Sequence, residues 1–173
     1  RQGTYQDVTD TTVTAQFKLV REDLPVFLQS GLETFVLAWT TTPWTLPSNT
    51  ALTVGPKIEY SLITSYNQYT GNKGNFIVAS ELVGKQFSGN YFEINEINEI
   101  DDYEFDSKKI PFVKVTSFTG KDLENIKYHQ LLDYCKPFQN PENAFRLICG
   151  DFVTTSDGTG IVHTAPTFGS DDA

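Results

Sequence analysis

Many short extended segments, most of them ended by a turn containing Gly, Pro or Asn, are spread along this chain of 173 residues. Residues 12–19 alternate apolar and polar side chains, which indicates a half-buried strand, and the more apolar residues 33–39 indicate a buried strand. Many short strands with few helices predict a β-rich barrel or sandwich. The length suits one domain with a hydrophobic core of its own.

The remaining strands are predicted from the same apolar patterns. They are expected over residues 51–54, 60–66, 76–79, 112–118, 144–148 and 151–155. A turn rich in Asn, Gly and Tyr is expected over residues 67–74. Residues 91–106 fit a short helix or an irregular strand equally well, because isoleucine recurs there every three residues.

Two local signals predict how particular segments begin and end. A short helix is expected to be capped by Ser80 and ended by Gly84. The dipeptide Asp157-Gly158 predicts a hairpin, because glycine tolerates positive φ. This hairpin would join residues 152–155 to residues 160–163 as an antiparallel pair.

The net charge of the chain limits which functions are plausible. The net charge of −9 argues against a free-standing nucleic-acid binder, because phosphate contacts usually require a basic surface. It argues less against a domain that receives only the terminal nucleotides of an RNA held elsewhere. Much of the acidity lies within residues 93–106, which we interpret as a solvated edge or loop.

Other features bear on cellular location and on completeness. No apolar run is long enough to cross a membrane, and no signal-peptide core begins the chain. Cys135 and Cys149 are therefore expected to be free, buried thiols in a cytoplasmic protein. The chain has no initiator methionine and stops two residues after Asp171, so we expect it to be a piece of a longer protein.

A stiff, hydroxyl-rich segment follows the strand expected at residues 33–39. It reads Trp39-Thr40-Thr41-Thr42-Pro43-Trp44-Thr45-Leu46-Pro47-Ser48-Asn49. Proline fixes φ, the β-branched threonines have restricted side-chain directions, and their hydroxyls both donate and accept hydrogen bonds. These properties suit the wall of a pocket for a small polar ligand with a short apolar part. The alternative is an ordinary strand and turn, with threonine chosen for β propensity.

A second segment, near the end of the chain, reads Asp157-Gly158-Thr159-Gly160-Ile161-Val162-His163-Thr164-Ala165-Pro166-Thr167-Phe168-Gly169-Ser170-Asp171-Asp172. Together with the Thr-rich segment, it resembles the editing domain of isoleucyl-tRNA synthetases, the insertion known as connective polypeptide 1. Residues 81–85 and 120–128 are similar to that family too, and the resemblance runs from about residue 5 to the end. The related valyl and leucyl domains carry arginine where this chain has Thr42, which favours the isoleucyl branch.

The resemblance implies a β-rich α+β fold, an editing-domain β-barrel with a few short peripheral helices, formed as a single domain by residues 1–173. It implies that a positioned water hydrolyses mischarged Val-tRNA(Ile), with valyl-adenylate as a further candidate substrate, and that pocket size excludes isoleucine. No metal or other cofactor is expected. The expected partners are the aminoacylated 3′ end of tRNA(Ile) and the rest of the synthetase, with no membrane contact.

The resemblance also implies which residues form the site. Those expected to act in catalysis and to bind substrate are Thr40, Thr41, Thr42, His163 and Asp172. Those expected to bind substrate only are Trp44, Asn49, Thr164 and Ala165. Trp44 would also shape the loop from behind, together with Pro47, and Asn49 would hold the loop through bonds to the backbone.

Two of these residues have specific implied roles. His163 would face the aminoacyl part and help to reject isoleucine, although a lone histidine on a strand is more often a satisfied core residue. Asp172 would pair with the substrate's α-ammonium group, while its neighbour Asp171 would point elsewhere. The alternative for the two aspartates is a solvent-exposed acidic pair. Neither Ser156 nor Ser170 has the context of a covalent nucleophile.

Two other functions remain open at this point. One is a non-catalytic β-barrel module that only binds tRNA 3′ ends or a partner protein. The other is a valyl-type editing domain that clears threonyl-tRNA, against which Thr42 argues. The Thr-rich segment, His163 and Asp172 together favour hydrolysis, because a module that only binds would not need all three.

Overall fold

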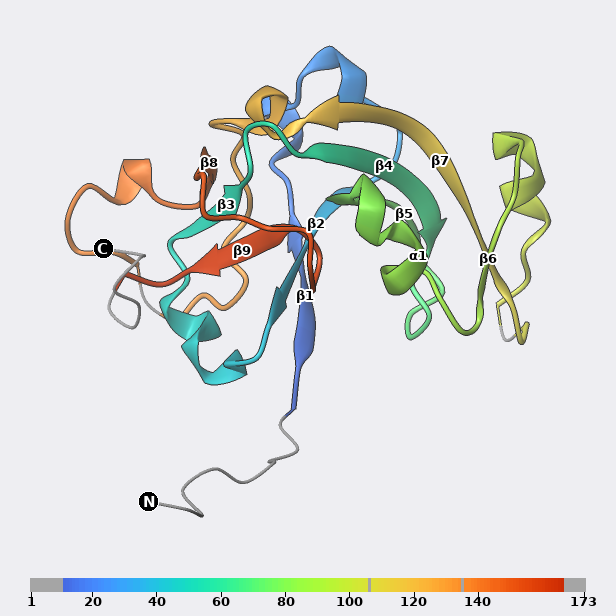
Figure 1. The fold of residues 1–173 in the computed structure, drawn as a ribbon, viewed down its shortest axis with the longest axis horizontal. Helices are drawn as coiled ribbons and strands as arrows, with labels where there is room; N and C mark the ends of the chain where they lie inside the picture. Colours follow the sequence, from blue (N-terminus) through green and yellow to red (C-terminus); the bar gives the residue numbers. More distant parts are fainter. Residues whose placement is uncertain (1–10, 106, 135, 167–173) are drawn as a thin grey trace.

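The computed structural model describes residues 11–105, 107–134 and 136–166, and these form two sheets (Figure 1). The larger sheet has the strand order β1-β2-β5-β4-β7-β6, with β1 and β6 at its two ends, and the smaller has the order β8-β3-β9. The strands are β1 Val13–Lys18, β2 Thr34–Thr40, β3 Ala51–Val54, β4 Glu59–Tyr66, β5 Lys73–Ala79, β6 Tyr91–Glu93, β7 Ile110–Thr119, β8 Arg146–Cys149 and β9 Ile161–Thr164.

The helices are short. One is an α-helix, α1 (Val83–Gln86). The others are 3₁₀ turns: η1 Arg21–Asp23, η2 Val26–Leu28, η3 Pro43–Ser48, η4 Ser80–Leu82, η5 Ile97–Asp102, η6 Gly120–Leu123 and η7 Pro141–Asn143. The predicted β-rich fold with a few short helices is therefore confirmed.

Strand β4 lies inside the larger sheet, between β5 and β7, and pairs antiparallel with both. Six successive β4 residues, 60–65, are buried, which is why this segment lacks a simple alternation of apolar and polar side chains. By contrast, β1 is an end strand and alternates as predicted, with Ala15, Phe17 and Leu19 buried. The turn expected over residues 67–74 joins β4 to β5.

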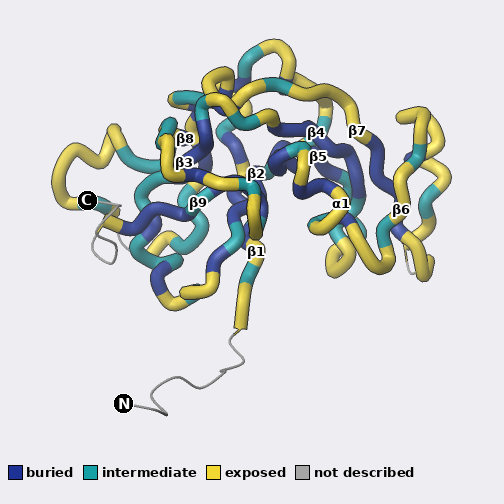
Figure 2. Tube along the Cα trace, viewed as in Figure 1, coloured by how far each residue is buried: buried dark blue, intermediate teal, exposed yellow. Residues whose placement is uncertain are grey.

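The smaller sheet shares its core with the larger one. Leu52 and Val54 of β3 and Leu147 of β8 are fully buried in the same apolar cluster as Phe17 and Ile77 of the larger sheet. Strand β9 pairs antiparallel with β3 and also lies against β2. In Figure 2 buried segments run through the region where the two sheets meet, while the peripheral loops are largely exposed.

The predicted helix boundaries at residue 80 are wrong. The Ser80 hydroxyl lies 2.7 Å from the Ser61 hydroxyl on β4 and makes no cap bond. Because that hydroxyl is engaged with the sheet, the first turn is a 3₁₀ turn without a side-chain cap. Gly84 lies within α1, which continues to Gln86.

The predicted strand over residues 151–155 is also wrong, and with it the hairpin at Asp157-Gly158. These residues form a loop, and only the following strand, β9, is present. The backbone oxygens of Ser156 and Gly158 accept hydrogen bonds from α1 side chains, so the loop bonds to a helix where a hairpin would bond to a second strand. The positive φ expected of Gly158 is observed, at 75°.

Residues 91–106 combine both expected conformations, because they contain β6 and then η5. Cys149 is a free thiol but is only half-buried, whereas Cys135 lies outside the described residues. Within the part of the chain that the structure describes, no helix has the length and apolar character needed to span a membrane. The assignment of residues 1–173 to one domain stays a prediction.

Gly160 provides a test of the close packing between the loop and the larger sheet. Its φ is +72°, and a Cβ atom there would lie 2.5 Å from Cβ of Ala79. We expect Gly160→Ala to lower the free energy of unfolding by about 2–4 kcal/mol, because steric overlap adds to backbone strain. Gly89 has φ +68° and open space around its Cβ position, so Gly89→Ala should cost only ~1–2 kcal/mol. Equal losses in urea unfolding would contradict the packing argument.

Tyr60 gives a prediction on alkaline stability. Its hydroxyl donates to the Gly160 carbonyl at 2.6 Å and accepts from the Gly55 N–H at 2.9 Å. Burial raises the pKa of Tyr60 from 10.0 to about 12. The folded state therefore binds this proton more tightly, and its contribution, on the order of 3 kcal/mol, should be present below pH 10.0 and lost as the pH rises toward about 12.

The measurement is the free energy of unfolding as a function of pH, for the wild type and for Tyr60→Phe. The variant should show a lower stability at neutral pH, because two hydrogen bonds are lost, and a shallower fall above pH 10.0. An identical alkaline slope in both proteins would show that Tyr60 does not carry the effect.

Candidate functional site

The Thr-rich segment begins at the end of β2 and turns through η3. Thr40, the last residue of β2, is buried, and its hydroxyl accepts the backbone N–H of Thr42 at 3.0 Å. The Thr42 hydroxyl lies 3.3 Å from that of Thr40 and 3.4 Å from that of Thr45. Pro43 occupies the first turn of η3, where its missing N–H costs no hydrogen bond. The segment is therefore a compact row of hydroxyl groups.

His163 meets this row from β9. It pairs with Leu52 of β3 in the antiparallel register and is 8% exposed. Its Nε2 lies 2.8 Å from the Thr45 hydroxyl, and its Nδ1 lies 3.0 Å from Nδ2 of Asn49. Residues more than 110 positions apart in the chain are thus joined directly by side-chain hydrogen bonds.

A cavity of about 610 Å³ lies over this cluster. Its wall includes most of the residues expected to form the site, with Trp44 standing 64% exposed. Trp44 thus lies in the cavity wall, where a residue expected to bind substrate should lie, and its substrate contact stays a prediction. The cavity is lined by Trp39, Thr40, Thr41, Thr42, Trp44, Thr45, Phe152, Thr154, Ser156, Asp157, Gly158, Thr159, Gly160, Ile161, Val162, His163 and Ala165.

Not every expected site residue reaches the cavity. Asn49 is buried behind His163 and donates from Nδ2 to the Ala51 carbonyl at 2.8 Å, which is the kind of loop-holding bond expected for it. The Thr164 hydroxyl lies 2.7 Å from that of Thr53 on β3, inside the smaller sheet. Asp172 and Asp171 lie outside the described residues. The roles assigned to these side chains stay predictions.

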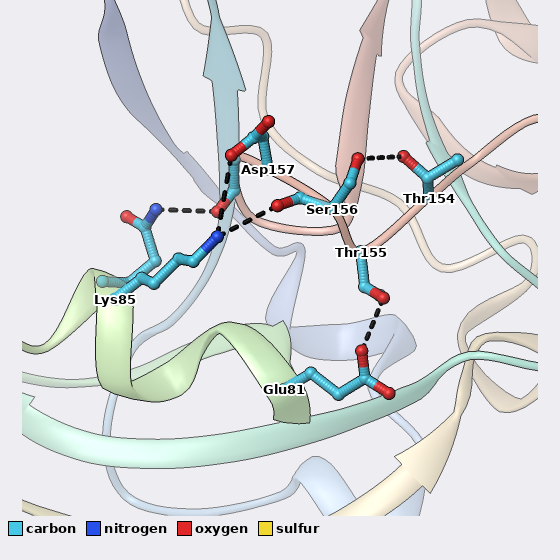
Figure 3. A network of polar contacts seen from close by, with 8 residues as sticks. Glu81, Lys85, Thr154, Thr155, Ser156 and Asp157 are labelled. Carbon is cyan, nitrogen blue, oxygen red and sulfur yellow. Dashed lines mark hydrogen bonds and ion pairs between the residues drawn. The ribbon is translucent and has the colours of Figure 1, made fainter.

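The loop that forms the opposite wall is held by η4 and α1 (Figure 3). Lys85 donates to the Ser156 carbonyl at 3.0 Å and lies 3.6 Å from the Asp157 carboxylate. Gln86 donates to the Gly158 carbonyl at 2.8 Å, and Thr155 donates to Glu81 at 2.6 Å. Several contacts to one short helical segment therefore position this wall, although each exposed ion pair contributes little by itself.

The chemistry available here is that of neutral hydroxyls around an imidazole. Among the described lining residues, Asp157 is the one carboxylate, and it is well exposed. The Thr45 hydroxyl donates to the Thr42 carbonyl at 2.8 Å, so its proton is already engaged and it is not poised as a nucleophile. Within the described ranges no group of three His, Cys, Asp or Glu side chains could hold a metal ion. The arrangement suits the binding and positioning of a small polar ligand or a water.

Two residues of this cluster were missed as site residues. Thr45 stands within the Thr-rich segment, and its spacing of three from Thr42 in a helical turn was a usable signal. Tyr128 donates its hydroxyl to Oδ1 of Asn49 at 2.5 Å. It is the last residue of the family-like segment 120–128, but that similarity assigned it no role in the site. Burial raises the pKa of Tyr128, so its hydroxyl remains a neutral donor.

No protein-family model matches the chain, but individual proteins do. It is 51% identical over 172 residues to the isoleucine–tRNA ligase of Bacteroides fragilis and 51% identical over 171 residues to that of Cytophaga hutchinsonii, in each case across 99% of this chain. It is 39% identical over 169 residues to the isoleucine–tRNA ligase of Clostridium tetani, across 97% of this chain. The chain spans only 12–14% of the length of these relatives.

Solved structures show the same fold at low sequence identity. The crystal structure of GlLeuRS-CP1 matches with a TM-score of 0.62 at 16% identity, over 94% of this chain and 57% of that chain. The crystal structure of the P. knowlesi cytosolic leucyl-tRNA synthetase editing domain matches with a TM-score of 0.61 at 11% identity, over 93% of this chain and 58% of that chain. This chain is related along nearly its whole length to a segment of isoleucine–tRNA ligases and has the fold of a CP1 editing domain, which confirms the resemblance found in its sequence.

Proposed function

We propose that this chain is the part of an isoleucine–tRNA ligase that hydrolyses mischarged Val-tRNA(Ile), with valyl-adenylate as a further candidate substrate. The observation that carries the proposal is the cluster of Thr40, Thr42, Thr45 and His163 in the wall of one cavity. The similarity to isoleucine–tRNA ligases is the reason for proposing this reaction, and the cluster forms the polar, rigid cavity wall where it would take place. The partners in this proposal are the aminoacylated tRNA 3′ end and the rest of the synthetase, in the cytoplasm.

The reaction needs a positioned water and stabilisation of a developing oxyanion. The hydroxyls of the threonine cluster are hydrogen-bonding groups that fit these tasks. In the proposal the hydroxyls of Thr40, Thr41 and Thr42 contact the ester, the terminal adenosine and the water. Asp172 pairs with the α-ammonium group and orients the substrate.

Selection against isoleucine depends on pocket size. One methylene changes binding by only about 1–3 kcal/mol, a general figure for which isoleucyl-tRNA synthetase is itself the reference case. A second site that is too small for isoleucine adds the missing discrimination. The buried His163 ring and the β-branched threonines are suited to this task, because close-packed side chains with satisfied hydrogen bonds yield little.

The first test is deacylation of Val-tRNA(Ile) and Ile-tRNA(Ile) by the wild type, Asp172→Ala and Asp171→Ala. Because the net charge of −9 predicts weak affinity for tRNA, the assay should use excess protein and a single turnover. The wild type should hydrolyse only the valyl ester. Asp172→Ala should lose at least about tenfold in rate, the effect of losing one charge-assisted contact, and Asp171→Ala should retain the rate.

Other outcomes separate the alternatives. Hydrolysis of threonyl-tRNA(Val) in preference to Val-tRNA(Ile) would favour the valyl-type function. A chain that binds a valyl-adenosine analogue but hydrolyses neither ester would favour a module that only binds. Full activity of Asp172→Ala would overturn the proposed role of this carboxylate.

A second prediction concerns the wall that His163 forms. His163→Ala removes an imidazole ring that is 8% exposed, so the cavity should enlarge by more than the one methylene that distinguishes isoleucine from valine. We expect the variant to hydrolyse Ile-tRNA(Ile) as well as Val-tRNA(Ile) in the same assay. A variant that still rejects the isoleucyl ester would show that the steric limit lies elsewhere in the cavity.

A further inference from the structure

Tyr128 lies outside the cavity wall but contacts the residue directly behind His163. Its ring is 2% exposed and packs edge-on against Phe17, at a centroid separation of 5.3 Å, and against Phe145 at 6.1 Å. Its backbone forms an isolated antiparallel bridge with Leu19, the residue that follows β1. The ring is therefore held by packing from two sides, and its hydroxyl donates to Oδ1 of Asn49 at 2.5 Å.

The orientation of the Asn49 amide follows from its neighbours. The carbonyl of Ala51 can only accept, and it lies 2.8 Å from the amide nitrogen, so Nδ2 must be on that side. The other amide atom, Oδ1, faces the Tyr128 hydroxyl. Rotating the amide by half a turn would set Oδ1 against the Ala51 carbonyl, which is repulsive. One hydrogen of Nδ2 then points toward Nδ1 of His163, 3.0 Å away.

The proton on the imidazole can be placed by the same reasoning. A donor at Asn49 requires that Nδ1 of His163 accepts. At the other edge of the ring, the single hydroxyl hydrogen of Thr45 is donated to the Thr42 carbonyl at 2.8 Å. The Thr45 oxygen, 2.8 Å from Nε2, must therefore accept from an Nε2–H group. Both edges of the ring indicate the same tautomer.

We infer that Tyr128 is a positioning residue that, through Asn49, fixes His163 as the tautomer protonated on Nε2 and locks its ring against the threonine cluster. The chain of donation runs from Tyr128 to Asn49, to His163, to Thr45 and to the Thr42 carbonyl. A histidine held in this way is a rigid neutral wall and an Nε2–H donor, and its Nδ1 lone pair is occupied. It is therefore not the general base.

The consequence for specificity rests on the proposed editing function. A wall excludes one methylene only if it cannot move by a fraction of the size of a methyl group, and the His163 ring is held at both edges. Removing the Tyr128 hydroxyl leaves Oδ1 of Asn49 buried without this donor. The amide, and with it the ring, then loses part of its restraint.

The tautomer can be measured without substrate. The chain contains two histidines, His129 and His163, so a long-range ¹H–¹⁵N correlation spectrum of the labelled protein resolves both rings. We expect His163 to be protonated on Nε2 in the wild type. Tyr128→Phe should increase the population protonated on Nδ1 and broaden the ring signals. Asn49→Asp replaces the donor with an acceptor, so it should draw a proton to Nδ1.

The matched control is Tyr91→Phe, which removes another partly buried phenol. Its hydroxyl donates to the Tyr66 carbonyl at 3.2 Å, in a contact that involves none of the residues of the His163 chain. This variant should leave the His163 spectrum unchanged. A wild-type His163 protonated on Nδ1 would overturn the inference, whether or not any variant folds. A folded Tyr128→Phe with the wild-type tautomer and line width would also overturn it.

Deacylation supplies the second measurement. Tyr128→Phe should raise the rate on Ile-tRNA(Ile) relative to Val-tRNA(Ile) by about tenfold, roughly the factor that one hydrogen bond contributes to an equilibrium. Tyr91→Phe should keep the wild-type ratio. If the wild type hydrolyses neither ester, the proposed function fails, while the tautomer measurement still decides the role of Tyr128. An unchanged ratio in Tyr128→Phe beside an altered tautomer would overturn the link to specificity.

Discussion

The pairing of β9 with β3 is the constraint on which the site depends. It brings Leu52 opposite His163, more than 110 residues later in the chain, and sets β9 against β2. Only then do the threonines that follow β2 lie beside the imidazole. Closing so long a loop costs conformational entropy, which is offset by apolar burial at Leu52, Val54 and Ile161. The site is therefore a product of long-range packing.

The polar cluster at this junction is satisfied almost entirely by neutral groups. Tyr128 donates to Asn49, and Asn49 and Thr45 contact the two ring nitrogens of His163. Thr45 also donates to a backbone carbonyl, and all these side chains are buried. A buried neutral network avoids the large desolvation cost of a buried charge, yet each missing partner would be costly. The same property gives the cluster one preferred arrangement, which a pocket that selects by size requires.

How far the sequence predicts this structure depends on the range of the interactions. The alternation in residues 12–19 and the turn after β4 are local, and both were predicted, although the turn ends at residue 72, before the start of β5. The strand expected at 151–155 is absent, and the loop that contains these residues is instead held to α1 by bonds from Lys85 and Gln86 to the carbonyls of Ser156 and Gly158. The three threonines and His163 could be found because a family motif marks them. Tyr128 lies in the family-like segment 120–128, but its role could not be predicted, because its contact with Asn49 forms only where distant segments meet.

The negative charge of the chain fits a site of this kind. The acidic residues within 93–105 lie around β6 and η5, at the far end of the larger sheet from β9 (Figure 1). The cavity itself is lined mainly by hydroxyls, glycines, apolar side chains and aromatic rings, with Asp157 as the one carboxylate among the described lining residues. In the proposed reaction such a surface selects the aminoacyl group by shape and hydrogen bonding, while affinity for the phosphates of tRNA has to come from the rest of the synthetase. A site that binds its substrate weakly by itself can then discriminate by steric fit, because binding energy from elsewhere brings correct and incorrect esters to it equally.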